Sequence, residues 1–249
     1  MKRIYIFVVI IFSLLATQIQ ADGNGGYAGA FLRMGLGARS IAMGNTGMAE
    51  KPNAYGAFYN PAIFGFMEGK MVGLSHSFLS LDRRVNYISF SMKVPPGAGF
   101  SIGWIETGAG DLKSYNSIGR ETGDINQTAN AVYFSFGRAF TQKLSIGVSI
   151  KILWEFINDG TDEFDYRANG VGIDFGAIYK LTDYLTLAYQ MKDIKSKFKA
   201  STDKIFEHGG TTIDNFPLIN KLGASYITPL EWMKVNYEFE WSDKESYKH

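Results

Sequence analysis

Hydrophobic and polar residues alternate along most of the chain between residues 71 and 241. Residues 143–156 show the pattern best: from 144 to 152 the even positions are leucine, isoleucine or valine, and the odd positions are serine, glycine or lysine. Residues 131–139 and 171–179 repeat it. Because successive side chains of a strand point to opposite sides, each segment has one hydrophobic and one hydrophilic face. The pattern predicts β-strands that separate an apolar from a polar environment.

About nine strands are predicted, most of them near the length of about ten residues that a strand needs to cross a bilayer. They are residues 71–79, 85–94, 100–107, 131–139, 143–156, 167–179, 184–191, 221–228 and 232–241. After the second strand, short connections (95–99, 140–142, 180–183, 229–231) alternate with long polar ones (108–130, 157–166, 192–220). Outer-membrane barrels have short periplasmic turns and long extracellular loops. The expected fold class is therefore all-β, a transmembrane antiparallel β-barrel. A soluble β protein with an aromatic core is the alternative.

Composition and the N-terminus agree with export to the cell envelope. The 249 residues include no cysteine, and the net charge of +1 offers no basic surface for nucleic acid. Residues 1–21 have the basic start and the short apolar run of a secretory signal peptide. We expect three parts: a signal peptide (1–21), an N-terminal plug or hatch segment (22–70) and a partial barrel (71–249). The expected location is the outer membrane of a Gram-negative bacterium, with membrane lipid as a partner.

The glycine-rich segment 25–66 breaks the strand pattern, and we expect it inside the barrel because it has no lipid-facing side.

The number of predicted strands is odd. Bacterial barrels close with an even number, and an open edge in lipid leaves backbone groups without partners. We therefore expect that this sequence is a fragment whose C-terminal strands, after residue 241, are missing; the alternative is a further strand before Met71.

Acidic residues on the hydrophilic strand faces predict charges inside the barrel. Asp174, Glu238 and Glu240 share their face with small or polar neighbours. They either line a substrate path or are hydrated or paired interior carboxylates, and the second interpretation is preferred. Arg39 either pairs with one of these three carboxylates or faces water at the periplasmic mouth.

Catalytic and metal-binding patterns are not found in the sequence. His76 is the only histidine within a predicted strand, and no nucleophile is indicated beside it. We therefore expect no enzyme activity, no cofactor and no metal. Residues 192–204 hold five lysines and are interpreted as a solvated basic loop; contact with lipopolysaccharide phosphates is the alternative.

Two motifs carry a resemblance to a known family. Residues 37–49 (GARSIAMGNTGMA) are similar to the opening motif of the PorV/PorQ family, and residues 59–62 (YNPA) resemble an element shared with the wider FadL superfamily. Residues 143–151 also resemble a strand of that group. The matching plug-motif positions are Gly37, Ala38, Arg39, Met43, Gly44, Gly47, Asn60, Pro61 and Ala62. The resemblance implies a FadL/PorV-like barrel of about fourteen strands.

The resemblance implies two functions. PorV takes part in type IX protein secretion, where it binds the signal domain of secreted cargo and hands the cargo on. Our first expectation is accordingly a PorV/PorQ-type protein that binds or shuttles cargo together with secretion-system components. FadL relatives pass hydrophobic molecules through an N-terminal hatch and a lateral opening. The alternative is therefore a passive transporter of small hydrophobic molecules, with Phe58, Phe64 and Phe66 as expected ligand contacts.

Overall fold

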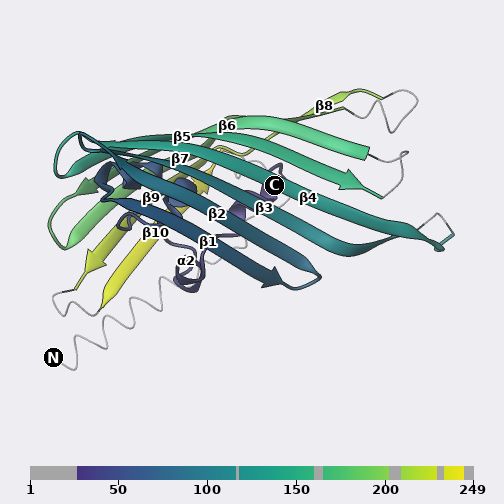
Figure 1. The fold of residues 1–249 in the computed structure, drawn as a ribbon, viewed down its shortest axis with the longest axis horizontal. Coiled ribbons are helices and arrows are strands. Elements are labelled where there is room, and N and C mark those ends of the chain that lie inside the picture. Colours follow the sequence, from purple (N-terminus) through teal and green to yellow (C-terminus); the bar gives the residue numbers. More distant parts are fainter. Residues whose placement is uncertain (1–26, 116–117, 160–164, 202–208, 229–232, 244–249) are drawn as a thin grey trace.

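The computed structural model describes residues 27–115, 118–159, 165–201, 209–228 and 233–243. Its main feature is one curved antiparallel sheet (Figure 1) in the order β1-β2-β3-β4-β5-β6-β7-β9-β10, with β8 paired to β7. The strands are β1 (Lys70–Leu79), β2 (Arg83–Val94), β3 (Ala98–Tyr115), β4 (Glu121–Ala139), β5 (Leu144–Asn158), β6 (Asp165–Lys180), β7 (Leu185–Ser201), β8 (Thr211–Asn215), β9 (Ile219–Ile227) and β10 (Lys234–Ser242). The predicted fold class is confirmed. The predicted signal peptide lies outside the described residues.

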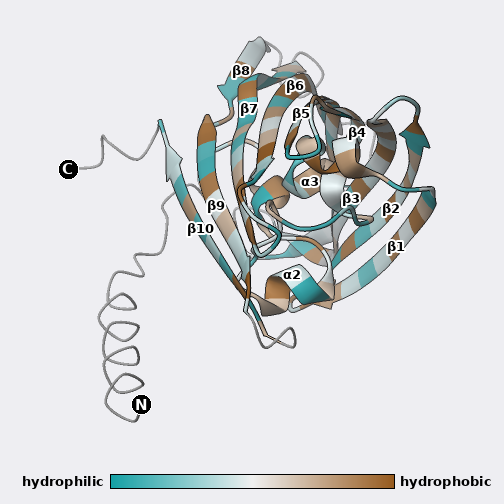
Figure 2. Cartoon of the chain, turned by 90° about the vertical axis from the view of Figure 1, so that its left-hand side faces the viewer, coloured by the Kyte–Doolittle hydropathy of each residue, from teal (hydrophilic) through white to brown (hydrophobic). Residues whose placement is uncertain are grey.

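The hydrophobic strand faces point outward. In β5, Val148, Ile150 and Ile152 are 43%, 53% and 45% exposed, whereas Ser149 and Lys151 between them are fully buried. Figure 2 shows why: the strands curve around the N-terminal helices, so the polar face is concave and covered. The alternation predicted from the sequence is correct. An apolar convex face is the arrangement expected where lipid surrounds a barrel wall.

The strands are longer than predicted, and two predicted loops are wrong. The predicted loop 108–130 is mostly paired strand, because β3 runs to Tyr115 and β4 begins at Glu121. Likewise β7 continues to Ser201, and β8 pairs with it inside the predicted loop 192–220. The extensions of β3 and β4 carry polar residues on both faces, so backbone pairing persists there while the period-two hydrophobic signal is lost. In the extension of β7 the exposed positions are mostly lysines and the buried ones include Phe198 and Ala200.

Strand β7 contains the main irregularity of the sheet. Its register against β6 shifts twice, between Val171 and Ile173 and between Ile173 and Phe175. Asp193 and Lys195 have positive φ angles of 61° and 51°. The bulge is held by a buried ion cluster: Lys151 Nζ lies 2.7 Å from Asp174 Oδ1 and also contacts Asp193 Oδ1. The Asp193 N–H donates to Asp174 Oδ1 at 2.8 Å.

The N-terminal segment (residues 27–66) forms only short helical turns: η3 (Ala30–Arg33), α2 (Ala38–Ala42), α3 (Gly56–Tyr59) and η4 (Pro61–Phe66). It lies against the concave face of the sheet (Figure 2). There Leu32, Phe58 and Phe64 join strand residues in the hydrophobic core. None of the helices in the described ranges has the length and apolar character that crossing a bilayer requires.

β1 and β10 end the described sheet on its two sides and are not paired with each other within the described residues.

Candidate functional site

A row of glycines on the concave face seats the N-terminal segment. Gly99, Gly137, Gly147 and Gly176 are successive cross-strand neighbours on β3, β4, β5 and β6. A Cβ atom on Gly147 would lie 2.4 Å from the carbonyl carbon of Pro61. The backbone of η4 therefore rests directly on the sheet, and only glycine leaves the space for it.

Asn60 is the central polar anchor of this contact. Its side chain is fully buried, and its Oδ1 accepts a hydrogen bond from the Ala62 N–H at 3.0 Å. Its Nδ2 donates to the carbonyls of Met48 at 3.1 Å and Ala177 at 3.4 Å. Pro61 then occupies the first position of η4, where a proline needs no donor. The predicted Asn-Pro-Ala motif thus joins two parts of the N-terminal segment to β6.

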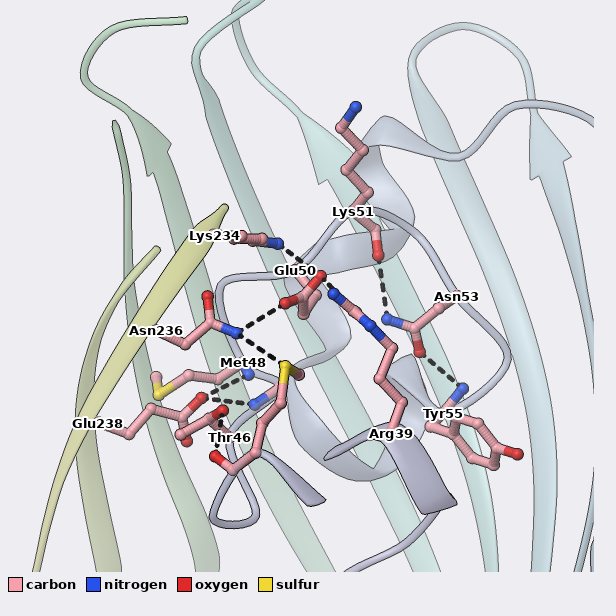
Figure 3. Close-up of polar contacts among 12 residues, drawn as sticks. Arg39, Thr46, Met48, Glu50, Lys51, Asn53, Tyr55, Lys234, Asn236 and Glu238 are labelled. Atoms are coloured by element: carbon pink, nitrogen blue, oxygen red, sulfur yellow. Dashed lines mark hydrogen bonds and ion pairs between the residues drawn. The ribbon is translucent and has the colours of Figure 1, made fainter. Parts of the chain in front are cut away.

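The second predicted motif is joined to β10 by a carboxylate that the sequence interpretation missed (Figure 3). Glu50 Oε2 lies 3.1 Å from Arg39 Nη1 and 2.6 Å from Lys234 Nζ, and Glu50 Oε1 accepts from Asn236 Nδ2 at 2.8 Å. The predicted partners of Arg39, which were Asp174, Glu238 and Glu240, are wrong. Burial acts to raise the pKa of Glu50, but Lys234, Asn236 and Arg39 outweigh it and hold this pKa below its ordinary value.

Each of the three predicted interior carboxylates has a partner. Glu238 Oε1 accepts from the Gly47 and Met48 N–H groups at 2.6 and 2.8 Å. Glu240 pairs with Lys221, and Asp174 with Lys151. All three therefore have structural contacts that account for their place on the concave side.

The remaining motif positions shape the turn around α2. Gly37 and Gly44 flank the helix with φ angles of 79° and 72°, a backbone conformation that favours glycine. Ala38 begins the helix, and Met43 follows it and accepts a hydrogen bond from Thr46 through its carbonyl.

A cavity of about 340 Å³ separates the N-terminal segment from β7, β9 and β10. Its apolar lining includes Leu32, Met34, Phe58 and Ile219. The Lys192 ammonium lies 4.2 Å from the centre of the Phe58 ring. Within the described residues this buried lysine has no ion pair, and Gln190 Nε2 has no hydrogen-bond acceptor. The cavity therefore combines these apolar side chains with polar ones, which include Arg33, Lys221 and Glu240. In the part of the chain that the structure describes, it holds a buried donor without an acceptor, Gln190 Nε2, beside an ammonium group without an ion pair.

Tyr59 closes one side of this cavity. Its hydroxyl accepts from the Leu36 N–H at 3.0 Å and lies 2.8 Å from the Leu36 carbonyl and 2.7 Å from Asn45 Oδ1. Burial raises the pKa of the Tyr59 hydroxyl, so the group stays protonated and neutral at any physiological pH.

The structure separates the three phenylalanines predicted to contact a ligand. Phe58 lines the cavity described above, whereas Phe66 lines a second cavity of about 530 Å³ near the turn at residues 181–184, with Lys180 3.7 Å from its ring centre. Phe64 is fully buried in the core and lines neither cavity. The sequence interpretation missed Gln190 and Lys192 as cavity residues. Lys192 was assigned to a loop, and the bulge in β7 makes it part of the cavity wall.

Comparison with protein-family models and with curated protein sequences gives no match. Solved structures do show the same fold. The chain is similar to the monoaromatic hydrocarbon channel CymD, with a TM-score of 0.59, 16% identity, and coverage of 84% of this chain and 69% of that one. It is also similar to the toluene transporter TodX of Pseudomonas putida, with a TM-score of 0.54, 16% identity, and coverage of 83% and 69%. At this identity the likeness establishes the FadL-like barrel fold.

Proposed function

We propose that the protein is an outer-membrane channel for small, mainly apolar molecules. The observation that carries the proposal is the cavity between the N-terminal segment and β7, β9 and β10, which has an apolar part formed by Leu32, Met34, Phe58 and Ile219 and lies inside a sheet whose outer face is apolar. The fold shared with the channel CymD and the transporter TodX supports it. In this proposal residues 22–70 act as the plug, and the protein carries out no catalysis.

The Gln190 amide and the Lys192 ammonium refine the ligand class. Gln190 Nε2 is a buried donor without an acceptor among the described residues, which costs roughly 1–3 kcal/mol that a ligand oxygen would recover. A ligand with a small apolar body against Leu32 and Phe58, and one acceptor near Gln190 and Lys192, fits both features. The volume of about 340 Å³ lies at the lower end of the range for small-molecule sites.

Ligand binding to purified protein in detergent tests the proposal. We expect a monoaromatic compound with one oxygen substituent, such as benzyl alcohol, to bind the intact chain and to bind more weakly to Phe58→Ala and Lys192→Met. Phe140→Ala is the matched control, because Phe140 is 60% exposed in the turn between β4 and β5. Equal binding by all four proteins, or no saturable binding to the intact chain, contradicts the proposal.

The secretion function is the second candidate, and the resemblance of residues 37–49 to the PorV/PorQ motif is what favours it. In the structure Arg39 pairs with Glu50, and the Gly47 N–H donates to Glu238. These contacts explain the motif as part of the internal packing of the protein, without a cargo. Cargo binding therefore stays a prediction of lower rank. Co-purification of type IX signal domains with the protein, and loss of their secretion on its deletion, would reverse the ranking.

A further inference from the structure

The convex face of β5, β6 and β7 carries a groove that the proposed channel does not use. Its volume is about 780 Å³. Its apolar side is formed by Ile152 and Trp154 on β5 and Val171 on β6, and its basic side by Lys197 and Lys199 on β7 with Arg167 on β6. Val171 and Lys197 are direct cross-strand partners, so the apolar and basic sides lie next to each other. The predicted basic loop is therefore wrong: Lys197 and Lys199 belong to β7 and are exposed, alternating with buried Ser196, Phe198 and Ala200.

The groove lies toward one end of β5, β6 and β7. β5, β6 and β7 have 15, 16 and 17 residues, whereas a bilayer takes up about 9–11 residues of a tilted strand. The short turn at residues 181–184 joins the other end of β6 and β7. Because short turns of such barrels are periplasmic, the groove lies toward the outer leaflet, near the level at which acyl chains give way to head groups. This placement rests on the proposed outer-membrane location.

The two lysines of the groove have no acidic partner among the described residues. No acidic side chain is among the described residues that line the groove, and neither Lys197 nor Lys199 has an ion-pair partner in the described ranges. Other lysines differ: Lys113 pairs with Glu121 and Asp124, Lys221 with Glu240, and Lys234 with Glu50. The two groove lysines therefore remain open to an anion.

An aromatic ring lies beside the third basic side chain of the groove. The Arg167 guanidinium is 5.3 Å from the centre of the Phe156 ring, within the range of a cation–π contact. Trp154, on the same strand as Phe156, lines the groove itself. Aromatic side chains next to basic ones are typical of the level at which a barrel wall passes from acyl chains to head groups.

We propose that this groove binds the phosphorylated lipid A part of lipopolysaccharide, with phosphate groups at Lys197, Lys199 and Arg167 and an acyl chain along Ile152 and Val171. Charge complementarity favours this occupant, because lipid A carries phosphates and acyl chains on one molecule and the groove has basic side chains directly beside apolar ones. Basic residues near an anionic lipid surface each strengthen binding about fivefold.

Native mass spectrometry of the detergent-purified protein with bisphosphorylated lipid A tests the site. The variant Lys197→Gln/Lys199→Gln should bind about thirtyfold more weakly than the intact chain. The matched control is Lys93→Gln/Lys143→Gln, which removes the same charge from exposed positions near the opposite end of the strands and should leave binding unchanged. Dephosphorylated lipid A should bind the intact chain as weakly as bisphosphorylated lipid A binds the double variant.

Three results would overturn the proposal: equal binding by the double variant and the intact chain, equal binding of dephosphorylated lipid A, or equally tight binding of phosphatidylglycerol, which would indicate a general anionic surface. The measurement of lipid A binding in detergent does not depend on whether the protein transports the aromatic ligand. The double variant should also keep its affinity for the aromatic ligand, because the groove and the cavity lie on opposite faces of the wall. Failure of the lipid site and failure of the channel proposal therefore give different results.

Discussion

Replacing Gly147 with alanine tests how the N-terminal segment is seated. The added Cβ would lie 2.4 Å from the Pro61 carbonyl carbon and 2.5 Å from the Ala62 nitrogen, both of them backbone atoms. An ordinary contact begins at 3.4 Å, so η4 must move by about 1 Å or the sheet must deform. Overpacking of this kind typically costs about 1–3 kcal/mol. We expect the loss to fall mainly on the docking of residues 60–66.

Hydrogen exchange of the detergent-purified protein measures this effect locally. In Gly147→Ala, the amides of Ala62 and Ile63 should exchange roughly 5–150-fold faster than in the intact chain, which is the factor that corresponds to about 1–3 kcal/mol. The control is Gly123→Ala in β4, where an added Cβ would meet its nearest atom at 3.8 Å. Equal exchange in the two variants would refute the claim that the glycine row makes room for η4.

Three further predictions concern polar groups. Asn60→Ala should destabilise the docked segment by roughly 2–4 kcal/mol, since it removes a buried amide and leaves the Ala62 N–H and the Met48 carbonyl unpaired; hydrogen exchange at Ala62 would report it. Glu50 has a pKa below its ordinary value of 4.5, so its stabilising effect is present above about pH 4.5 and is lost as the pH falls through the lowered value. Proteolysis of the N-terminal segment should therefore increase on acidification, and Glu50→Gln should reduce that pH dependence. Lys151→Met should destabilise the fold by about 3–5 kcal/mol in denaturant titrations, because it leaves two buried carboxylates without their cation; an effect no larger than that of Lys143→Met would contradict this.

The sequence predicts the strands well in the part of the sheet where one face meets an apolar solvent. In β5 the positions of Ile150 and Lys151 follow directly from alternation, because one must avoid water and the other must avoid lipid. The same signal fails in the outer parts of β3 and β4. There Lys113 and Asp124 face each other across a ladder with water on both sides, so polar residues are found on both faces.

Contacts between distant parts of the chain are not predictable from local pattern. Glu50 meets Lys234 and Asn236 because β10 happens to pass that part of the N-terminal segment, and nothing near residue 50 specifies this. Lys192 and Asp193 are adjacent in sequence and both lie on the buried side, whereas successive side chains of a regular strand point to opposite faces. The double bulge in β7 makes it possible. The glycine row had a readable signal, since Gly137, Gly147 and Gly176 all occupy the hydrophilic strand face.

The central claim is that the convex face of the sheet touches lipid and the concave face does not. The chain has no cysteine, so single spin labels can be placed at Ile150→Cys and Ser149→Cys and measured in reconstituted membranes. The account predicts that the label at residue 150 collides with dissolved oxygen and is shielded from a water-soluble nickel chelate, whereas the label at residue 149 is shielded from oxygen. Equal access of the nickel chelate to both labels, or recovery of the folded protein in plain buffer without detergent, would contradict it.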